Sequence, residues 1–472
     1  MHISLLHYLD QCIGNYETSR QTSLHPMLLN GTLILSAYYT SWSIYGRNFQ
    51  VPQLPFKNLT HINYAFAGVE ASGNVYLTDL WADIQRPDTQ RQVGPDGLSG
   101  NLGALYEYKQ ENPGLKVGLS VGGWDGSSGF SSAAATSQSR STFAKSALNL
   151  ILNLGLDYID LDWEYPVSGG RDGQLHAVDD GRNYVLLLQE IRAEFSRAIK
   201  DGRWRGTQPP GISLALPCGQ FVGRYDYLKE MGQLVDYANM MCYDFSGPTS
   251  AVGDHHSNLF SRHVGNYSAD AGIKELLATG FPARKIILGI PIYGRGFDNC
   301  AGLTASFKGS PAGTWGEPGV FDYKSLNLRH NATYCKPLIE LKTNGTYCHN
   351  SQLNRLLVYD SVTAVQKKVA YVKKNGLAGV MFWEASADIY TDPRDGLIAA
   401  AKASIYPYTL DRISNNLCYP NSTYSNVNSL QNCTYKSGPG GDYFPQITKL
   451  APVNIENVKK AAPFGSRIHR KL

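Results

Sequence analysis

Eight short β-rich apolar segments, most of them separated by helical patterns, constrain the fold of this chain more than any other feature. The segments are residues 33–39, 61–68, 116–123, 156–163, 211–217, 237–244, 285–292 and 379–385. Amphipathic helical patterns lie between most of them, at residues 136–153, 180–199, 224–234, 270–279, 361–375 and 395–404. Near-continuous apolar strands that alternate with helices predict a parallel sheet covered on both faces, which is an α/β fold.

Eight such units close most economically into a (β/α)8 TIM barrel, with the active site at the carboxyl ends of the strands. An open, doubly wound sheet is the alternative, but no glycine-rich phosphate loop follows the first strand. The last two strands are too far apart for one connecting helix. We therefore expect a small α+β domain at residues 298–358, between the seventh strand (285–292) and the seventh helix of the barrel (361–375). The barrel would comprise residues 33–297 and 359–405, flanked by extensions at 1–32 and 406–472.

The fourth apolar segment carries acidic residues in alternation: Asp160, Asp162 and Glu164. Alternate side chains of a strand share a face, so the three acids would point one way and Leu161 and Trp163 the other. Acids on a buried face are costly unless they serve a purpose or share protons. Because like charges that close cannot all ionise, the pKa of one carboxyl is pushed upward. A raised pKa of Glu164, at the tip of the strand, suits the general acid of glycoside hydrolysis.

Two further observations bear on this strand. A solvated face of an edge strand is the alternative, but Leu161 and Trp163 on the other face need a covering layer. Asp157 has the opposite parity to the three acids, so we expect it to serve a structural purpose at the strand entrance.

The segment from Asp157 to Glu164 resembles the DxxDxDxE signature of the family-18 glycoside hydrolases, the chitinases and their relatives. Other segments resemble further motifs of this family and fall on the predicted strands in family order. They are YYT (38–40) with SWSIYGRNF (41–49), SVGGW (120–124), MCYD (241–244), YGR (293–295) and MFWE (381–384). The resemblance runs from about residue 33 to residue 430, and its last part, NLCYPNSTYSN (416–426), is similar to the tail of fungal-type class V members.

The resemblance implies an endochitinase that hydrolyses β-1,4 bonds between N-acetylglucosamine units by retaining, substrate-assisted catalysis. The acetamido oxygen of the sugar would attack its own anomeric carbon, giving an oxazolinium ion, so no protein carboxylate acts as nucleophile. Glu164 would protonate the leaving oxygen and later activate water. Asp162 would bind the acetamido N–H, and Asp160 would share a proton with Asp162. Tyr243 would hold the acetamido carbonyl by a hydrogen bond.

By the same resemblance, a further group of side chains would line the substrate site: Tyr38, Phe66, Trp124, Met241, Asp244, Tyr293, Arg295 and Trp383. Trp383 would form the floor under the distorted sugar, because aromatic faces suit the apolar faces of pyranose rings. Core packing is the alternative for the aromatic residues, and pairing with a carboxylate is the alternative for Arg295. No cofactor is implied and no metal site is expected, since no His/Cys cluster has ligand spacing. His255 and His256 are expected in a solvated loop.

The chain departs from the family pattern after Asp244. Members commonly continue with Gly, one residue and then a tryptophan that stacks on a leaving-side sugar, whereas this chain has Gly247-Pro248-Thr249. We expect weaker binding there, by about 1–3 kcal/mol if aromatic stacking on bases is a fair guide. Three alternative functions stay open: a non-catalytic chitin-binding lectin, an endo-β-N-acetylglucosaminidase acting on N-glycans, and a folded but impaired chitinase.

Charge, hydropathy and sequons bound the partners. The net charge is only +4 with dispersed basic residues, which argues against nucleic acid, and no apolar run is long enough to span a membrane. The expected partner is chitin or a chito-oligosaccharide, bound by a monomer. The Asn-X-Ser/Thr sequons at Asn30, Asn58, Asn266, Asn331, Asn344, Asn421 and Asn432 favour a secreted, extracellular glycoprotein, although residues 1–12 form a poor signal peptide.

Seven of the eight cysteines divide into two groups by their surroundings. Five lie in two polar stretches and predict local disulfides: Cys300, Cys335 and Cys348 in one, and Cys418 and Cys433 in the other. Cys218 and Cys242 lie within apolar strands and are expected to be free, buried thiols.

Overall fold

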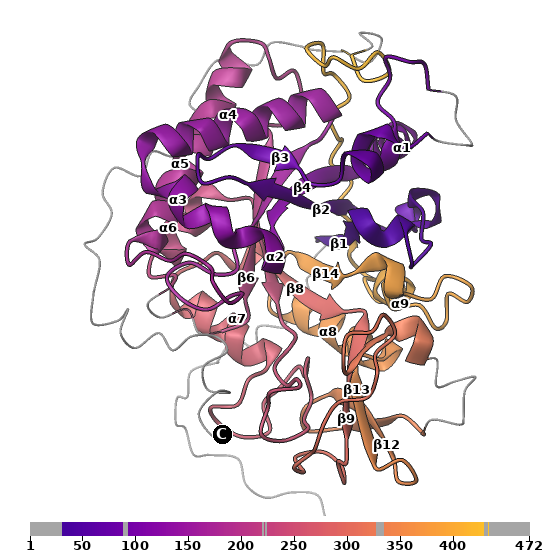
Figure 1. Cartoon of the computed structure of the whole chain (residues 1–472). Coiled ribbons are helices and arrows are strands. Elements are labelled where there is room, and N and C mark those ends of the chain that lie inside the picture. Colours follow the sequence, from indigo (N-terminus) through magenta and orange to yellow (C-terminus); the bar gives the residue numbers. More distant parts are fainter. Residues whose placement is uncertain are drawn as a thin grey trace, which may run out of the picture.

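The computed structural model describes residues 31–87, 93–219, 221, 224–326, 335–428 and 433. Parallel strands form a closed barrel within this part of the chain (Figure 1): β1 (Thr32–Thr40), β2 (His61–Val69), β4 (Lys116–Gly122), β5 (Tyr158–Asp162), β6 (Gly211–Pro217), β7 (Tyr237–Met241), β8 (Ile286–Pro291) and β14 (Gly379–Trp383). Each strand pairs with the next, and β1 pairs with both β2 and β14, which closes the ring. The predicted (β/α)8 barrel is confirmed, and the open sheet is excluded.

Helices surround the barrel. The predicted ones are α4 (Ser137–Leu154), α5 (Asp180–Lys200), α6 (Leu228–Leu234), α7 (Ala269–Ala278), α8 (Val362–Lys374) and α9 (Leu397–Ala403). The sequence patterns did not predict α1 (Gly100–Glu111), α2 (Gly123–Gly126) or α3 (Phe130–Ala135). None of the described helices is long and apolar enough to cross a membrane.

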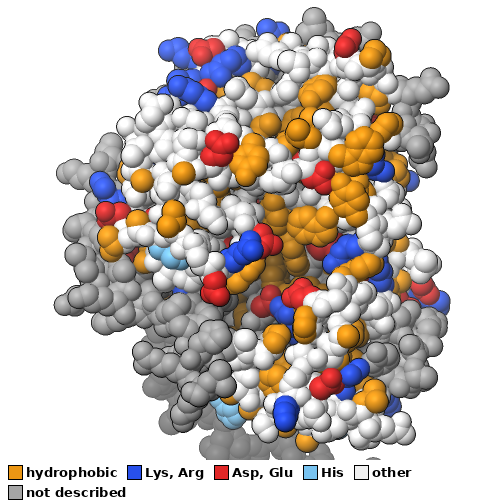
Figure 2. Space-filling view, in the orientation of Figure 1, with side chains coloured by type: hydrophobic (Ala, Val, Ile, Leu, Met, Phe, Trp, Pro, Cys, Tyr) orange, Lys and Arg blue, Asp and Glu red, His pale blue; other side chains and the backbone are white. Residues whose placement is uncertain are grey.

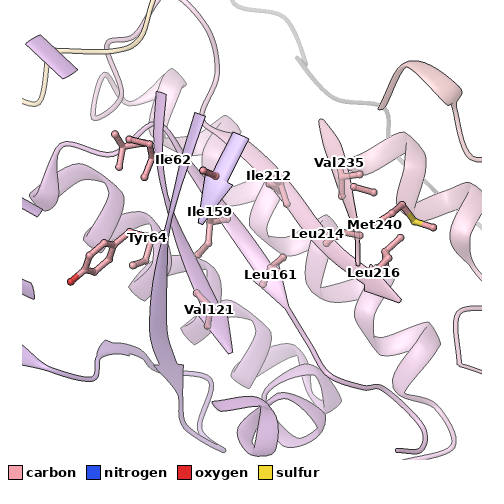
Figure 3. Close-up of a cluster of buried hydrophobic side chains, with 14 of the residues drawn as sticks. Ile62, Tyr64, Val121, Ile159, Leu161, Ile212, Leu214, Leu216, Val235 and Met240 are labelled. Atoms are coloured by element: carbon pink, nitrogen blue, oxygen red, sulfur yellow. The ribbon is translucent and has the colours of Figure 1, made fainter. Parts of the chain in front are cut away.

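The main hydrophobic core lies between the strands and these helices. Ile159 and Leu161 of β5 belong to it, together with Leu214 of β6 (Figure 3). Trp163 is fully buried, and its ring stacks on that of Phe130 with a centroid distance of 5.3 Å. Leu161 and Trp163 therefore have the covering layer that they were expected to need, and the residues of opposite parity face the barrel interior.

Asp157 connects the entrance of β5 to the segment that follows the barrel. Its carboxylate accepts hydrogen bonds from the backbone N–H groups of Val117 (2.8 Å) and Asn416 (2.8 Å), and it pairs with Lys109 at 3.0 Å. The structural purpose predicted for Asp157 is confirmed. Residues 1–30 and 434–472, most of the two predicted extensions, lie outside the described residues, as do the sequons at Asn30, Asn331 and Asn432.

A second, antiparallel sheet lies between β8 and α8 in the sequence. It consists of β9 (Tyr293–Asp298), β10 (Val320–Asp322), β11 (Leu338–Glu340), β12 (Gly345–Asn350) and β13 (Arg355–Tyr359), in the order β10-β9-β13-β12-β11. Figure 1 shows it below the barrel, at the lower right. Because β9 begins two residues after β8 ends, this sheet starts at the carboxyl end of the barrel. Two shorter strands, β3 (Val75–Leu77) and β15 (Thr409–Leu410), extend the edges of β2 and β1.

The disulfide bonds differ in part from the prediction. They join Cys218 to Cys242, Cys335 to Cys348 and Cys418 to Cys433. The prediction of free thiols at Cys218 and Cys242 is wrong. Each cysteine directly follows the last residue of its strand, and those last residues, Pro217 and Met241, pair with each other, so the two cysteines meet across neighbouring strands. Among the described cysteines, Cys300 alone is unpaired, and it is buried.

Candidate active site

Asp160 lies inside the barrel and is fully buried. Its carboxylate accepts hydrogen bonds from four side chains on four different strands: Tyr38 Oη (2.7 Å), Ser120 Oγ (2.8 Å), Ser213 Oγ (2.5 Å) and Asn239 Nδ2 (3.3 Å). Burial raises the pKa of Asp160, while these hydrogen bonds favour the ionised form and oppose the shift. The residue is therefore held rigidly by the barrel, beneath the surface of any cavity.

Asp162 and Glu164 follow at the carboxyl end of β5. Asp162 is buried, and its Oδ1 has no hydrogen-bond partner within the described residues. Burial raises the pKa of Asp162, and the charges of Glu164 and Asp160 raise it further. The pKa of Glu164 is raised to about 7, mainly by burial and less by the charges of Asp244 and Asp125, while a hydrogen bond with Tyr165 opposes the shift. A protonated Glu164 is thus well populated near neutral pH.

The two glycines of the SVGG segment are required by close contacts at this end of the barrel. Gly122 and Gly123 have φ angles of 104° and 74°, which side chains other than glycine rarely adopt. A Cβ on Gly122 would lie 2.4 Å from the carbonyl oxygen of Asp162, and one on Gly123 would lie 2.6 Å from the ring of Phe66. Gly122 therefore lets β4 pass directly beside the acidic strand, and Gly123 leaves room for the ring of Phe66.

Ser127, in the turn after α2, fixes the backbone that carries Glu164. Its hydroxyl accepts a hydrogen bond from the Glu164 N–H at 2.9 Å. The same hydroxyl lies 3.0 Å from the carbonyl oxygen of Asp162 and 2.8 Å from that of Gly123. Ser127 was not predicted, and it holds the main chain on both sides of Trp163.

An aromatic wall stands beside the acids. The ring of Trp383 meets that of Tyr38 edge-on at a centroid distance of 5.2 Å and stacks on that of Phe66 at 5.7 Å. Trp42, which was not singled out from the sequence, continues the wall with its ring 6.3 Å from Phe66 and remains 42% exposed. Four aromatic rings from three separate segments thus form one surface that ends in solvent.

Polar residues face the aromatic wall. Nη2 and Nε of Arg295 donate to Oδ1 of Asp244 at 2.6 and 2.9 Å. Burial alone would raise the pKa of Asp244, but Arg295 and His256 hold it well below its usual range. Tyr243 packs against Tyr293 with a centroid distance of 6.2 Å. Arg295 therefore does pair with a carboxylate, and that carboxylate is itself a predicted site residue.

The prediction of a solvated loop at His255 and His256 is wrong, because both side chains are buried. Nε2 of His255 lies 3.0 Å from Glu340 of the second sheet, and Nδ1 of His256 lies 3.8 Å from Asp244. Burial lowers the pKa of both histidines. They are covered by groups that are distant in the sequence, so nothing local to the two residues signals their burial.

A cavity of roughly 1900 Å³ lies between Asp162 and Glu164, the aromatic wall and the Arg295–Asp244 pair. Its lining includes every predicted site residue except Asp160, which lies beneath it. Figure 2 shows hydrophobic side chains gathered in the central hollow, with acidic and basic side chains at its rim. Trp124 stands at the rim and is 49% exposed, and Thr249 lines the cavity as well.

A cluster around Arg47 borders the cavity and was not predicted. Nη1 of Arg47 lies 2.9 Å from Asp322 of β10 and 3.1 Å from Glu384, the residue after Trp383. Its guanidinium lies over the ring of Trp315 at 5.1 Å. The sequence did carry a signal for Arg47, because this residue belongs to the SWSIYGRNF segment (41–49) that resembles a family motif. The cluster joins the loop after β1, the second sheet and the end of β14.

The charged side chains around the cavity do not form a cluster of metal ligands within the described residues. Within the described ranges, no group of three or more His, Cys, Asp or Glu side chains is arranged to hold a metal ion. Some of the charged residues around the cavity are instead paired with one another, as in the Arg295–Asp244 and Arg171–Asp125 pairs.

Comparisons with known proteins agree with this geometry. Residues 34–388 match the model of the glycosyl hydrolases family 18. Endochitinase 1 of Metarhizium robertsii is 37% identical, and chitinase 1 of Aphanocladium album is 35% identical, each over 84% of this chain and 90% of the relative. Among solved structures, chitinase ChiA74 from Bacillus thuringiensis has a TM-score of 0.72 at 27% identity, covering 82% of this chain and 71% of that one.

The catalytic domain of psychrophilic chitinase B from Arthrobacter TAD20 also has a TM-score of 0.72, at 25% identity, and covers 82% of this chain and 99% of that domain. The family match spans the barrel, the acidic strand and the aromatic wall. The chain therefore belongs to family 18 of the glycosyl hydrolases.

Proposed function

We propose that this glycoside hydrolase is an endochitinase that cleaves β-1,4 bonds between N-acetylglucosamine units with retention of configuration. The observation that carries the proposal is the acidic array of β5. Glu164, a carboxyl with a pKa of about 7, lines the same cavity as Asp162, whose buried Oδ1 has no partner within the described residues. Relatives named as endochitinases and chitinases support chitin as the substrate.

The first step begins with protonated Glu164. It donates its proton to the glycosidic oxygen as the bond to the anomeric carbon breaks, while the acetamido oxygen of the same sugar attacks that carbon. Asp162 accepts a hydrogen bond from the acetamido N–H and stabilises the positive charge of the oxazolinium ion. The unpartnered Oδ1 of Asp162 suits this task, because a buried acceptor gains most from a partner that arrives with the substrate.

The second step reverses the proton transfer. Ionised Glu164 removes a proton from water, and the water oxygen attacks the anomeric carbon and opens the oxazolinium ring. Tyr243 holds the acetamido carbonyl in place during both steps, and Asp160 supports Asp162 from below by sharing a proton. The sugar lies on the wall formed by Trp383, Phe66 and Tyr38, with Asp244, Tyr293, Arg295 and Met241 around it and Trp124 on the leaving-group side.

The alternative functions predict different results in one assay. A fluorogenic N,N′-diacetylchitobioside should be hydrolysed by the wild-type chain. Glu164→Gln should abolish turnover and still bind chito-oligosaccharides. Binding without turnover by the wild-type chain would instead indicate a lectin, and release of whole N-glycans from a glycoprotein would indicate an endo-β-N-acetylglucosaminidase. Slow turnover by a well-folded wild-type chain would indicate the impaired chitinase.

Secretion belongs to the same proposal. Disulfide bonds persist in oxidising compartments, and three join cysteines in the described part of the chain. The sequon residues Asn266 and Asn421 are exposed, so both could carry glycans. We propose an extracellular, monomeric glycoprotein whose barrel comprises residues 33–297 and 359–405, with residues 298–358 as the inserted domain. Mass spectrometry of the exported chain before and after deglycosylation tests the glycoprotein assignment.

A further inference from the structure

The Cys218–Cys242 disulfide lies where the pairing of β6 with β7 ends. The last paired residues of the two strands are Pro217 and Met241. The cysteines are the next residues along, with their Cα atoms 4.8 Å apart. The disulfide therefore extends the contact between the two strands by one residue beyond the last backbone pair.

Tyr243 lies directly after this covalent link. The N–H of Cys242 bonds to the carbonyl of Met240 at 2.8 Å, which marks the turn by which the chain leaves the strand. Past this turn Tyr243 has no strand partner, and Asp244 has a φ of 59°, outside the extended range. The backbone of Tyr243 is therefore held between Cys242 and Phe245, whose N–H bonds to the carbonyl of His256 at 3.0 Å.

Cys242 faces away from the cavity, whereas its neighbours face into it. It is fully buried in the core between the barrel and the helices. Met241 and Tyr243 belong to the cluster inside the barrel that includes Tyr38 and Trp383. Cys242 thus acts from behind, as an anchor between two residues of the site.

The partner cysteine is fixed in turn by α7. A Cβ added to Gly272 would lie only 2.6 Å from Sγ of Cys218, so the sulfur fills the space that this glycine leaves. Cys218 also contributes to the lining of the cavity. The link between the strands is consequently held on both sides, by the core at Cys242 and by the helix at Cys218.

We infer that Cys218 and Cys242 are positioning residues, whose disulfide holds Tyr243 at the acetamido group of the substrate. The inference rests on the proposed role of Tyr243. A displacement of about 1 Å at a reacting group can reduce the rate about a hundredfold. Loss of the link lowers kcat by about tenfold or more and leaves KM within about twofold, because the aromatic wall that binds the sugar is on other strands.

The test compares two disulfides that close loops differing less than twofold in length. The double variant Cys218→Ala/Cys242→Ala removes the link behind Tyr243. The control Cys335→Ala/Cys348→Ala removes a link in the second sheet that does not line the cavity. The sequence separations are 24 and 13 residues, and loop-closure entropy depends only logarithmically on length, so the two losses of stability should be similar.

Kinetics on the fluorogenic chitobioside are measured where circular dichroism shows each variant folded. We expect a lower kcat at similar KM for Cys218→Ala/Cys242→Ala and near wild-type values of both constants for the control. Wild-type kcat in a folded Cys218→Ala/Cys242→Ala protein would overturn it, and so would equal losses of kcat in both double variants. If this variant does not fold, the single Cys218→Ala variant replaces it. Failure of that variant to fold as well would overturn the positioning role in favour of a folding role. Absence of turnover by the wild-type chain would refute the proposed function instead.

Discussion

The buried carboxylate of Asp160 makes a sharp prediction about stability. Asp160→Ala would leave four donors facing an empty site, those of Tyr38, Ser120, Ser213 and Asn239. A buried polar group without a partner costs about 1–3 kcal/mol. Taking the low end for each donor, the free energy of unfolding should fall by about 4 kcal/mol.

Asp160→Asn is the matched control. The amide has the same shape, keeps one acceptor oxygen and adds an N–H donor. Hydroxyl groups can both donate and accept, so Tyr38 and Ser120 can turn to meet that donor. Burial already favours the neutral form of Asp160, which the amide resembles. The free energy of unfolding should therefore change by only about 1 kcal/mol.

Urea denaturation followed by tryptophan fluorescence measures both variants against the wild type. Equal stability of Asp160→Ala and Asp160→Asn would contradict this prediction, since it would mean that the four donors do not depend on the carboxylate of Asp160. Turnover by the folded Asp160→Asn variant should fall, because Asp162 loses the neighbour with which it is proposed to share a proton.

Three other perturbations test the site. The kcat/KM of the wild-type chain should fall as the pH rises above about 7, because Glu164 must be protonated to act and its pKa is about 7; a pH profile flat to pH 9 would contradict this. The pKa of Glu164 in the folded chain is raised from its ordinary value of 4.5, so ionisation costs stability as the pH rises from about 4.5 to 7. Glu164→Gln should accordingly be more stable than the wild type at pH 8, by up to about 3 kcal/mol in urea denaturation, and an equal or lower stability would show that burial is not the cause. Thr249→Trp should lower the KM for chitotetraose by placing an aromatic ring in the cavity lining, and an unchanged KM would count against a leaving-side subsite there.

The sequence predicted the barrel well, for a physical reason. Strands covered on both faces must be nearly continuous apolar runs, and such runs stand out without knowledge of their partners. Helix α1 was missed because its sequence, GNLGALYEYKQE, contains two glycines and no clear apolar stripe. The length of the connection between β8 and β14 predicted the insertion, but it could not reveal that β9 begins two residues after β8 ends.

Contacts between distant segments account for the errors at the site. By contrast, the alternation of side chains along β5 and the residues after it was enough to predict, from the local sequence alone, that Asp160 and Trp163 lie on opposite faces. The pairing of Cys218 with Cys242 depends on the register between β6 and β7, which neither strand encodes separately. The burial of His255 depends on Glu340, and the cluster around Arg47 depends on Asp322. Both acids belong to the second sheet, whose packing the local patterns do not specify.

The anomeric configuration of the first product distinguishes attack by the acetamido oxygen from direct attack by water. Proton NMR during the first minutes of chito-oligosaccharide hydrolysis, before mutarotation, resolves the two anomers of the new reducing end. Attack by the acetamido oxygen followed by attack by water inverts the anomeric carbon twice, so we expect the β-anomer first. An initial excess of the α-anomer would show direct attack by water and would contradict the substrate-assisted mechanism.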